Sequence, residues 1–352
     1  MKPTIWVFGL EPLDSRYTQQ WYTHIPEVLA NAAGERFNVR QIAGIQREQT
    51  VTAGAFLNFT DTNYWKSTQL CEFIRLFDAG EVGPDDRILF TDTWNPAILQ
   101  VRYMRDLMDQ RWVMHGIWHA GAYDPTDILG MKMQKPWPWH AETAMFMACD
   151  YNYYATEFHM QMFLTNLDVH PEEQYRAVRS GQPHGLIVDA MQAYQNVSKI
   201  SSDYVMWPHR YNADKQPEIA EDLARHFHMI ITQKHNFSKS EYYEKLAQSR
   251  VIFSCALHEN LGISIMEAVL AGVIPVLPDR CSYAEMYDPI FLYPSEWTES
   301  FENYEKHQLE LLTFIQDRIT DYDSYLPALE AQRQRLIADY LNADVMIGNL
   351  TQ

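Results

Sequence analysis

The stretch from Val251 to Pro278, VIFSCALHENLGISIMEAVLAGVIPVLP, constrains the fold more than any other part of the chain. Apolar runs at 251–255 and 273–277 have the length of buried strands, and the segment between them has the spacing of a helix that opens near Gly262. A strand, a helix and a second strand in this order form one unit of a parallel sheet. The sequence therefore predicts an α/β protein.

Two glutamates flank the start of this helix. Glu259 lies in the loop after the first strand, and Glu267 lies two turns into the helix. Loops at this edge of a parallel sheet bind ligands, and the N–H groups and positive dipole end of a helix start favour an anion such as a diphosphate. Gly262 lets the backbone approach such a group closely. These features favour a nucleotide-sugar, and the alternative is two unrelated glutamates on a solvated helix face.

Glu259, the seven residues after it, Glu267 and the segment Ala271–Val276 together resemble the donor-site motif of retaining family 4 glycosyltransferases. The resemblance implies the GT-B fold, in which two Rossmann-like domains face each other across a cleft. It implies that Glu267 holds ribose hydroxyls and that Glu259 orients the sugar. His258 and Ile263 are then neighbours of the nucleotide-sugar. No metal ion or other cofactor is expected.

The length of 352 residues is sufficient for two domains. We expect an N-terminal acceptor domain at 1–195 and a C-terminal donor domain at 196–352, and it stays open whether the terminal helices pack back on the first domain. The apolar content of 47% is typical of a globular protein, and we find no apolar run long enough to span a membrane. The first residues favour a strand over a signal peptide, so we predict a cytoplasmic protein, in the host cytoplasm if a phage encodes it.

The net charge of −18 argues against broad affinity for nucleic acid but leaves room for a local basic site. Arg210 and Lys215 follow the predicted strand 203–207, at the same sheet edge as Glu259. Two cations there would neutralise a diphosphate leaving group. The competing interpretation is a solvated cluster of basic residues. The four cysteines lack metal-ligand spacing, and we expect them to be reduced.

Three loops of the N-terminal half supply candidates for binding the acceptor. They follow the predicted strands 4–10, 87–91 and 111–118. The candidates are Ser15, Arg16, Asp92, Trp94 and Tyr123. Simple helix capping is the alternative for Ser15 and Arg16, and capping of the next helix by Asp92 or Asn95 is the alternative for the loop of Asp92 and Trp94.

Other candidates come from two neighbouring stretches. His119 resembles the active-site histidine of family 4 enzymes, which lies near the reacting sugar, whereas His115 is expected to be a core residue. The segment 136–139, Pro-Trp-Pro-Trp, is predicted to be a rigid loop, either an acceptor platform or lid or a packed surface.

A closer resemblance runs through residues 203–295. Trp207-Pro208-His209-Arg210, Asp214-Lys215, Ala256–Glu259 and Pro278–Arg280 are similar to the tRNA-queuosine mannosyltransferase group. The loop after the first strand departs from that group. The N-terminal start, LEPLDSRYT, is more similar to glycosyltransferases of large bacteriophages that modify hydroxylated or hydroxymethylated pyrimidines in viral DNA.

These resemblances imply a retaining glycosyltransferase that moves a sugar from a nucleotide-sugar, UDP-linked in the leading interpretation, to a modified base. The leading acceptor is hydroxymethylcytosine in phage DNA, with DNA favoured over tRNA as partner and no membrane involved. One alternative is a tRNA-queuosine mannosyltransferase that uses GDP-mannose. A second is a bacterial transferase with a small or lipid-linked acceptor, and a third is a non-catalytic nucleotide- or DNA-binding module. His119, Glu259, Arg210 and Lys215 are the predicted catalytic residues.

Overall fold

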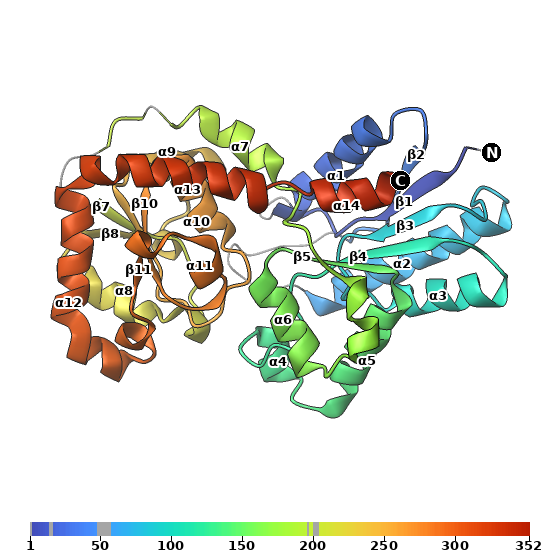
Figure 1. The fold of residues 1–352 in the computed structure, drawn as a ribbon, viewed down its shortest axis with the longest axis horizontal. Helices are drawn as coiled ribbons and strands as arrows, with labels where there is room; N and C mark the ends of the chain where they lie inside the picture. Colours follow the sequence, from blue (N-terminus) through green and yellow to red (C-terminus); the bar gives the residue numbers. More distant parts are fainter. Residues whose placement is uncertain (1, 14–16, 48–57, 196, 200–203) are drawn as a thin grey trace. The chain divides into compact units, whose positions relative to one another are not determined.

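The computed structural model describes residues 2–13, 17–47, 58–195, 197–199 and 204–352. The chain forms two compact units (Figure 1). The first unit comprises residues 1–155, 159–183 and 343–352, and the second comprises 156–158 and 184–342. The predicted domain boundary at residue 195 stays a prediction. In the structure, the chain passes from the first compact unit to the second between Pro183 and His184. Helix α7 (Gly185–Gln192), which follows this point, packs against α10 (Ile263–Leu270) of the second unit.

The first unit contains a six-stranded sheet in the order β2-β1-β3-β4-β5-β6, and every pairing is parallel. The strands are β1 (Thr4–Phe8), β2 (Asn38–Ile42), β3 (Arg87–Phe90), β4 (Val113–Ile117), β5 (Tyr151–Tyr154) and β6 (Ala177–Arg179). The helices are α1 (Tyr17–Ala33), α2 (Phe59–Asp78), α3 (Ala97–Leu107), α4 (Ile128–Lys132), α5 (Pro136–Ala148), α6 (Glu157–Asn166) and α14 (Asp344–Thr351). All five residues of β1 are buried, as expected for a strand covered on both faces.

The second unit contains a five-stranded sheet in the order β11-β10-β9-β7-β8, again with parallel pairings. Its strands are β7 (Tyr204–Trp207), β8 (His228–Ile231), β9 (Val251–Phe253), β10 (Ile274–Pro278) and β11 (Leu292–Tyr293). Besides α7 and α10 its helices are α8 (Pro217–Leu223), α9 (Lys239–Gln248), α11 (Cys281–Met286), α12 (Phe301–Thr320) and α13 (Leu326–Asp339). The predicted strand–helix–strand unit is β9-α10-β10, and the predicted α/β class is confirmed.

Three local predictions are wrong. The segment 136–139 is the first turn of α5 and not a loop, because Pro136 occupies the first helical position, where a missing N–H costs nothing. The mixture of Pro, Gly and polar residues at 168–200 predicts an irregular connection between the domains, but this segment contains β6, α7 and a 3₁₀ turn at Pro171–Arg176. The apolar segment 289–293 predicts a last strand, yet Pro289–Phe291 form a 3₁₀ turn and β11 has only two residues.

The part of the chain that the structure describes has no helix that is both long and apolar enough to cross a membrane.

Candidate functional site

The donor candidates of the second unit lie in two loops that follow β7 and β9, which are neighbouring strands. The loops are hydrogen-bonded to each other, since the Leu257 N–H donates to the Asp214 carbonyl at 2.7 Å. Gln216, whose φ of 50° is in the left-handed region, donates from Nε2 to the Cys255 carbonyl at 2.6 Å. Arg280 donates from Nη2 to the same carbonyl at 2.9 Å. The two loops are therefore held in one fixed arrangement.

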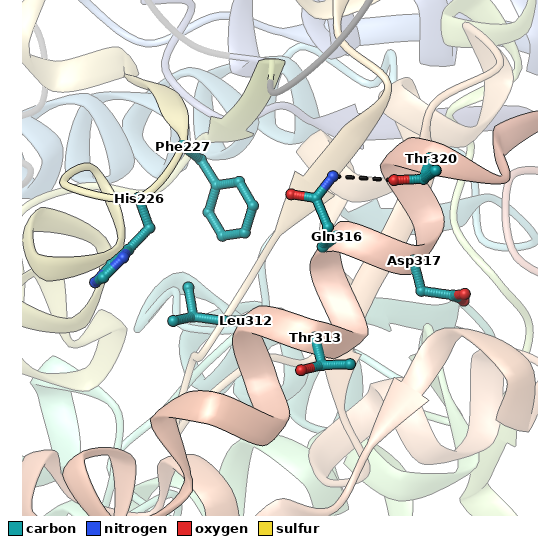
Figure 2. A pocket seen from close by; sticks show the side chains of 7 residues that line it. All are labelled: His226, Phe227, Leu312, Thr313, Gln316, Asp317 and Thr320. Atoms are coloured by element: carbon teal, nitrogen blue, oxygen red, sulfur yellow. Dashed lines mark hydrogen bonds between the residues drawn. The ribbon is translucent and has the colours of Figure 1, made fainter.

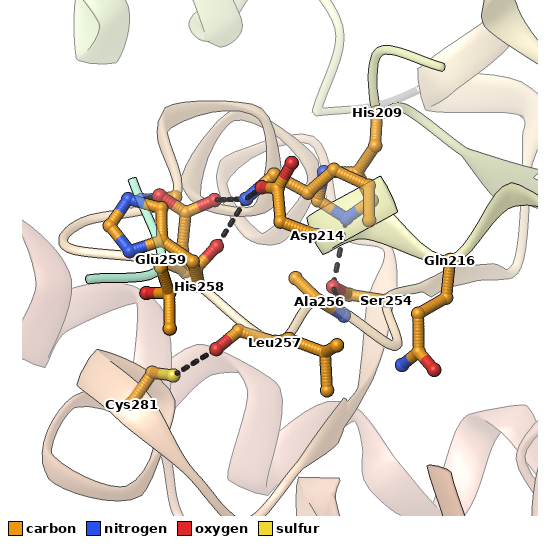
Figure 3. A network of polar contacts seen from close by, with 12 residues as sticks. His209, Asp214, Gln216, Ser254, Ala256, Leu257, His258, Glu259 and Cys281 are labelled. Atoms are coloured by element: carbon orange, nitrogen blue, oxygen red, sulfur yellow. Dashed lines mark hydrogen bonds and ion pairs between the residues drawn. The ribbon is translucent and has the colours of Figure 1, made fainter. Parts of the chain in front are cut away.

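Lys215 contacts residues of both loops, and Figure 3 shows three of these neighbours, Asp214, His258 and Glu259. Its side chain is only 8% exposed, and Nζ lies 3.3 Å from Asp214 Oδ2 and 3.4 Å from Glu259 Oε2. It also donates a hydrogen bond to the His258 carbonyl. A lysine ammonium has three N–H donors, so these three oxygens can use all of them. The structure thus brings the predicted residues Lys215, Glu259 and His258 together, in a network that is complete without a ligand.

Glu259 also caps the start of α10. Its Oε1 accepts hydrogen bonds from the N–H groups of Gly262, at 2.9 Å, and Leu261, at 3.4 Å. Burial opposes ionisation, but Lys215, together with His209, His258 and the Leu261 N–H, outweighs burial and lowers the pKa of Glu259 to about 2. The carboxylate is therefore ionised. It already accepts a hydrogen bond from the Gly262 N–H, one of the helix-start N–H groups that were predicted to favour a phosphate. The N–H groups of Ile263 and Ser264 lie in the first turn, where no intrahelical partner exists.

A buried histidine supports the base of the site. His209 is 5% exposed, and its Nε2 lies 2.8 Å from Ser254 Oγ, which in turn lies 3.2 Å from the Tyr283 hydroxyl. Burial lowers the pKa of His209 to about 3, with Lys215 adding to the effect, so the ring is neutral near pH 7. The same tyrosine limits the space at Gly262, whose φ is +75° and where a Cβ would approach Tyr283 to 3.2 Å.

The other donor candidates differ in their surroundings. Glu267 is 8% exposed and accepts a hydrogen bond from the Tyr243 hydroxyl at 2.9 Å. Burial raises the pKa of Glu267, and the Tyr243 hydrogen bond and the charge of Lys239 only partly offset this. Arg210 is exposed, and Ile263 is half-buried. The predicted contact of Glu267 with ribose stays a prediction. Ribose hydroxyls would compete with the Tyr243 hydroxyl for the Glu267 carboxylate.

In the first unit, Asp92 and Trp94 follow β3 as predicted and are held by Lys66. Asp92 Oδ2 pairs with Lys66 Nζ at 2.9 Å, and the same ammonium donates to the Trp94 carbonyl. The two charged side chains are 18% and 8% exposed, respectively. Burial opposes ionisation of Asp92, but Lys66 and then His119 outweigh it and lower its pKa. Lys66 was not identified from the sequence, although it shares the apolar face of α2 with Leu70, four residues later.

His119 lies near this pair, and both of its ring nitrogens face protein groups. Nε2 is 2.8 Å from the Thr91 carbonyl, so it carries the proton, and Nδ1 is 3.4 Å from the Gln182 amide. Burial lowers the pKa of His119, against the charge of Asp92. The ring is therefore a neutral group of fixed orientation. The predicted position of His119 near the reacting sugar stays a prediction, and its contact with Gln182 could not be predicted from the sequence.

Tyr123 lies in the core and not at a surface. It is 1% exposed, packs edge-to-face on Trp118 at 5.9 Å, and its hydroxyl bonds to His159. The predicted contact with an acceptor is therefore corrected: the Tyr123 ring has no free face in this structure. Glu142 instead organises this loop, and no sequence signal identified it.

Glu142 accepts hydrogen bonds from three groups, although it is 1% exposed. The donors are the N–H groups of Ala122 at 2.6 Å and Tyr123 at 2.9 Å, and Trp94 Nε1 at 3.0 Å. Burial raises the pKa of Glu142 to about 7. The carboxyl group thus joins the loops that follow β3 and β4 and titrates near neutral pH.

The predicted acceptor residues Ser15 and Arg16 lie outside the described residues. Within the described ranges, no three His, Cys, Asp or Glu side chains are grouped as metal ligands. A hollow of about 530 Å³ in the second unit contains none of the predicted residues (Figure 2). It is lined by His226, Phe227, Leu312, Thr313, Gln316, Asp317 and Thr320.

No family model matches the chain. A tRNA-queuosine alpha-mannosyltransferase of Drosophila melanogaster is 24% identical over a match that covers 26% of this chain and 32% of that protein. The chain therefore matches about a third of the length of this curated relative.

Solved structures resemble nearly the whole chain. Sucrose-phosphate synthase from Thermosynechococcus elongatus has a TM-score of 0.59 at 12% identity, with 99% of this chain and 97% of that chain covered. The lipopolysaccharide outer core galactosyltransferase WaaB has a TM-score of 0.59 at 9% identity, with 100% and 99% covered. The pneumococcal O-GlcNAc transferase GtfA, solved with UDP and GlcNAc, has a TM-score of 0.52 at 12% identity, with 81% and 59% covered. The fold is that of GT-B glycosyltransferases.

Proposed function

We propose that this protein is a retaining glycosyltransferase that transfers a sugar from a nucleotide-sugar to a modified base in nucleic acid. The observation that carries the proposal is the network of Lys215, Glu259 and the start of α10 at the exits of β7 and β9. Ligands of open parallel sheets bind at this edge. The glycosyltransferase relatives and the nucleotide found with GtfA support the same reading.

The donor is proposed to enter by exchange within this network. A diphosphate would replace one of the carboxylates at Lys215, while Arg210, which is exposed, and the first N–H groups of α10 add positive charge. The bond between the anomeric carbon and the diphosphate then breaks, and the diphosphate keeps the electron pair. The acceptor hydroxyl bonds to the anomeric carbon, and its proton passes to the leaving diphosphate. Cations near the leaving oxygen act most strongly in this transition state.

The acceptor is proposed to be a hydroxylated or hydroxymethylated pyrimidine of DNA, with UDP as the nucleotide of the donor. Resemblance of the N-terminal start to phage DNA glycosyltransferases supports this choice. A second candidate is the tRNA-queuosine reaction with GDP-mannose, which the match to the Drosophila enzyme favours. Asp92 and Trp94, held by Lys66, are the acceptor contacts proposed in the first unit.

Replacing Lys215 by Ala tests the donor site. Losing one transition-state partner typically costs on the order of 3 kcal/mol, so the transfer rate should fall roughly a hundredfold. The matched control is Lys306→Ala, since Lys306 is an exposed lysine that pairs with Glu302 on α12 and should leave the rate unchanged. A folded Lys215→Ala variant with wild-type turnover would refute the assignment.

The acceptor is identified by mass spectrometry of nucleosides. Hydroxymethylcytosine-containing DNA and bulk tRNA are each incubated with the protein and a panel of UDP- and GDP-sugars. A sugar-sized mass gain on the DNA base establishes the first candidate, and a gain on tRNA alone establishes the second. Donor hydrolysis without either gain rejects the nucleic-acid acceptor and keeps the donor site.

A further inference from the structure

Residues 131–140, which run from the end of α4 into the first turn of α5, form an exposed aromatic and basic segment of the first unit. Trp137 is 60% exposed, Trp139 is 47% exposed and Met131 is 42% exposed. The exposed members are Met131, Lys132, Gln134, Lys135, Pro136, Trp137, Trp139 and His140. Large rings left in water within one short segment are typical of an interaction surface. We call these ten residues the 131–140 surface.

The charge of this surface is opposite to that of the whole protein. Lys132 and Lys135 are its charged residues, and no acidic residue occurs between Asp127 and Glu142, which is itself buried. The chain as a whole carries −18. A polyanion would therefore be repelled by much of the molecule and attracted locally here. This charge complementarity selects a phosphate-bearing partner over a neutral one.

The positions of Trp137 and Trp139 on α5 indicate which kind of phosphate-bearing partner fits this surface. Residues two apart on a helix do not face each other, so Trp137 and Trp139 present separate ring faces and not one flat wall. Separate ring faces suit successive unstacked bases, since each base can stack on its own ring. Proline at the first and third helical positions fixes the backbone between them.

The surface is also tied to the candidate acceptor residues. Trp139 donates from Nε1 to the Ala122 carbonyl at 2.9 Å, and the Ala122 N–H donates to Glu142 at 2.6 Å. Glu142 in turn accepts from Trp94 Nε1 at 3.0 Å. The 131–140 surface therefore adjoins, within the same unit, the loops that follow β3 and β4.

We propose that the 131–140 surface binds an unpaired stretch of the DNA strand that carries the acceptor base. Trp137 and Trp139 stack on bases, and Lys132 and Lys135 contact the flanking phosphates. The inference rests on the proposed nucleic-acid acceptor. Stacking on these rings requires bases that have left the duplex, as does any chemistry on a base that is buried in its stack.

The test measures the binding of a fluorescein-labelled oligo-dT by fluorescence anisotropy over a range of salt concentrations. Trp137→Ala/Trp139→Ala should raise Kd about tenfold or more. Lys132→Ala/Lys135→Ala should reduce the slope of log K against log salt by about 1.4, the value for two phosphate contacts with a single strand. The control is Tyr103→Ala on α3, a 68% exposed ring outside the surface, which should leave Kd unchanged. Trp137→Ala alone serves if the double variant does not fold.

Each outcome separates this inference from the proposed function. If the wild type glycosylates DNA and the tryptophan variants keep the wild-type Kd and KM, the surface is not the binding site, while the function stands. If the wild type neither binds oligo-dT nor modifies any nucleic acid, both proposals fail. Binding of tRNA through the same residues, without binding of oligo-dT, overturns DNA as the partner. Donor hydrolysis by the tryptophan variants should equal that of the wild type, and a parallel loss would indicate damage to the fold.

Discussion

Replacing Glu259 by Gln removes the charge that pairs with Lys215 but keeps the size of the side chain and an oxygen that can cap Gly262. The pKa of Glu259 falls from 4.5 to about 2 in the folded protein. At 1.36 kcal/mol per pKa unit, the ionised side chain adds about 3 kcal/mol to the free energy of unfolding at pH 7. Because the folded-state pKa is the lower one, this contribution is complete above pH 4.5 and is lost as the pH falls through 2.

The assay is urea unfolding of the wild type and Glu259→Gln at several pH values. We expect the difference in unfolding free energy to narrow by about 2 kcal/mol between pH 7 and pH 3. Glu302→Gln is the control, because Glu302 forms an exposed pair with Lys306 and the change should leave the free energy of unfolding nearly unchanged at either pH. A difference that does not vary with pH would show that Lys215 does not stabilise the ionised form of Glu259.

Two further predictions concern the first unit. Lys66→Met leaves Asp92 without its cation, so the free energy of unfolding should fall by about 1–3 kcal/mol and the pKa of Asp92 should rise, as measured by urea unfolding and by NMR titration. If neither the free energy of unfolding nor the pKa of Asp92 changes, Lys66 does not stabilise the ionised form of Asp92. Burial raises the pKa of Glu142 from 4.5 to about 7, so its contribution to stability is complete below pH 4.5 and is lost as the pH rises through 7. Glu142→Gln should abolish this part of the pH dependence in the same assay, and identical pH profiles would contradict the assignment.

Much of the fold follows from local patterns. The apolar runs around Gly262 identify β9, α10 and β10, because strand length and helical spacing are properties of neighbouring residues. The capping box of Ser238 and Glu241 likewise marks the start of α9. The two-residue length of β11 was not predicted, and the helical start at Pro136 was missed although proline at a first helical position is itself a local signal.

The site was less accessible to prediction than the fold. Sequence position placed Lys215 and Glu259 at one sheet edge, but not their 3.4 Å ion pair or the capping of Gly262. Glu142 and Lys66 were missed because each acts on loops that are distant in sequence, and only the packed structure brings those groups within hydrogen-bonding distance. Contacts of this kind carry no periodic signal.

The last helix, α14, belongs to the first unit, where it packs against α1 and where Asn349 bonds to Tyr153. Residues 343–352 are synthesised after every residue of the second unit. During translation, the second unit can therefore fold while the first still lacks a helix of its own. The N-terminal unit is therefore begun first and completed last. Its helix α14 can pack only after residues 343–352 have been synthesised.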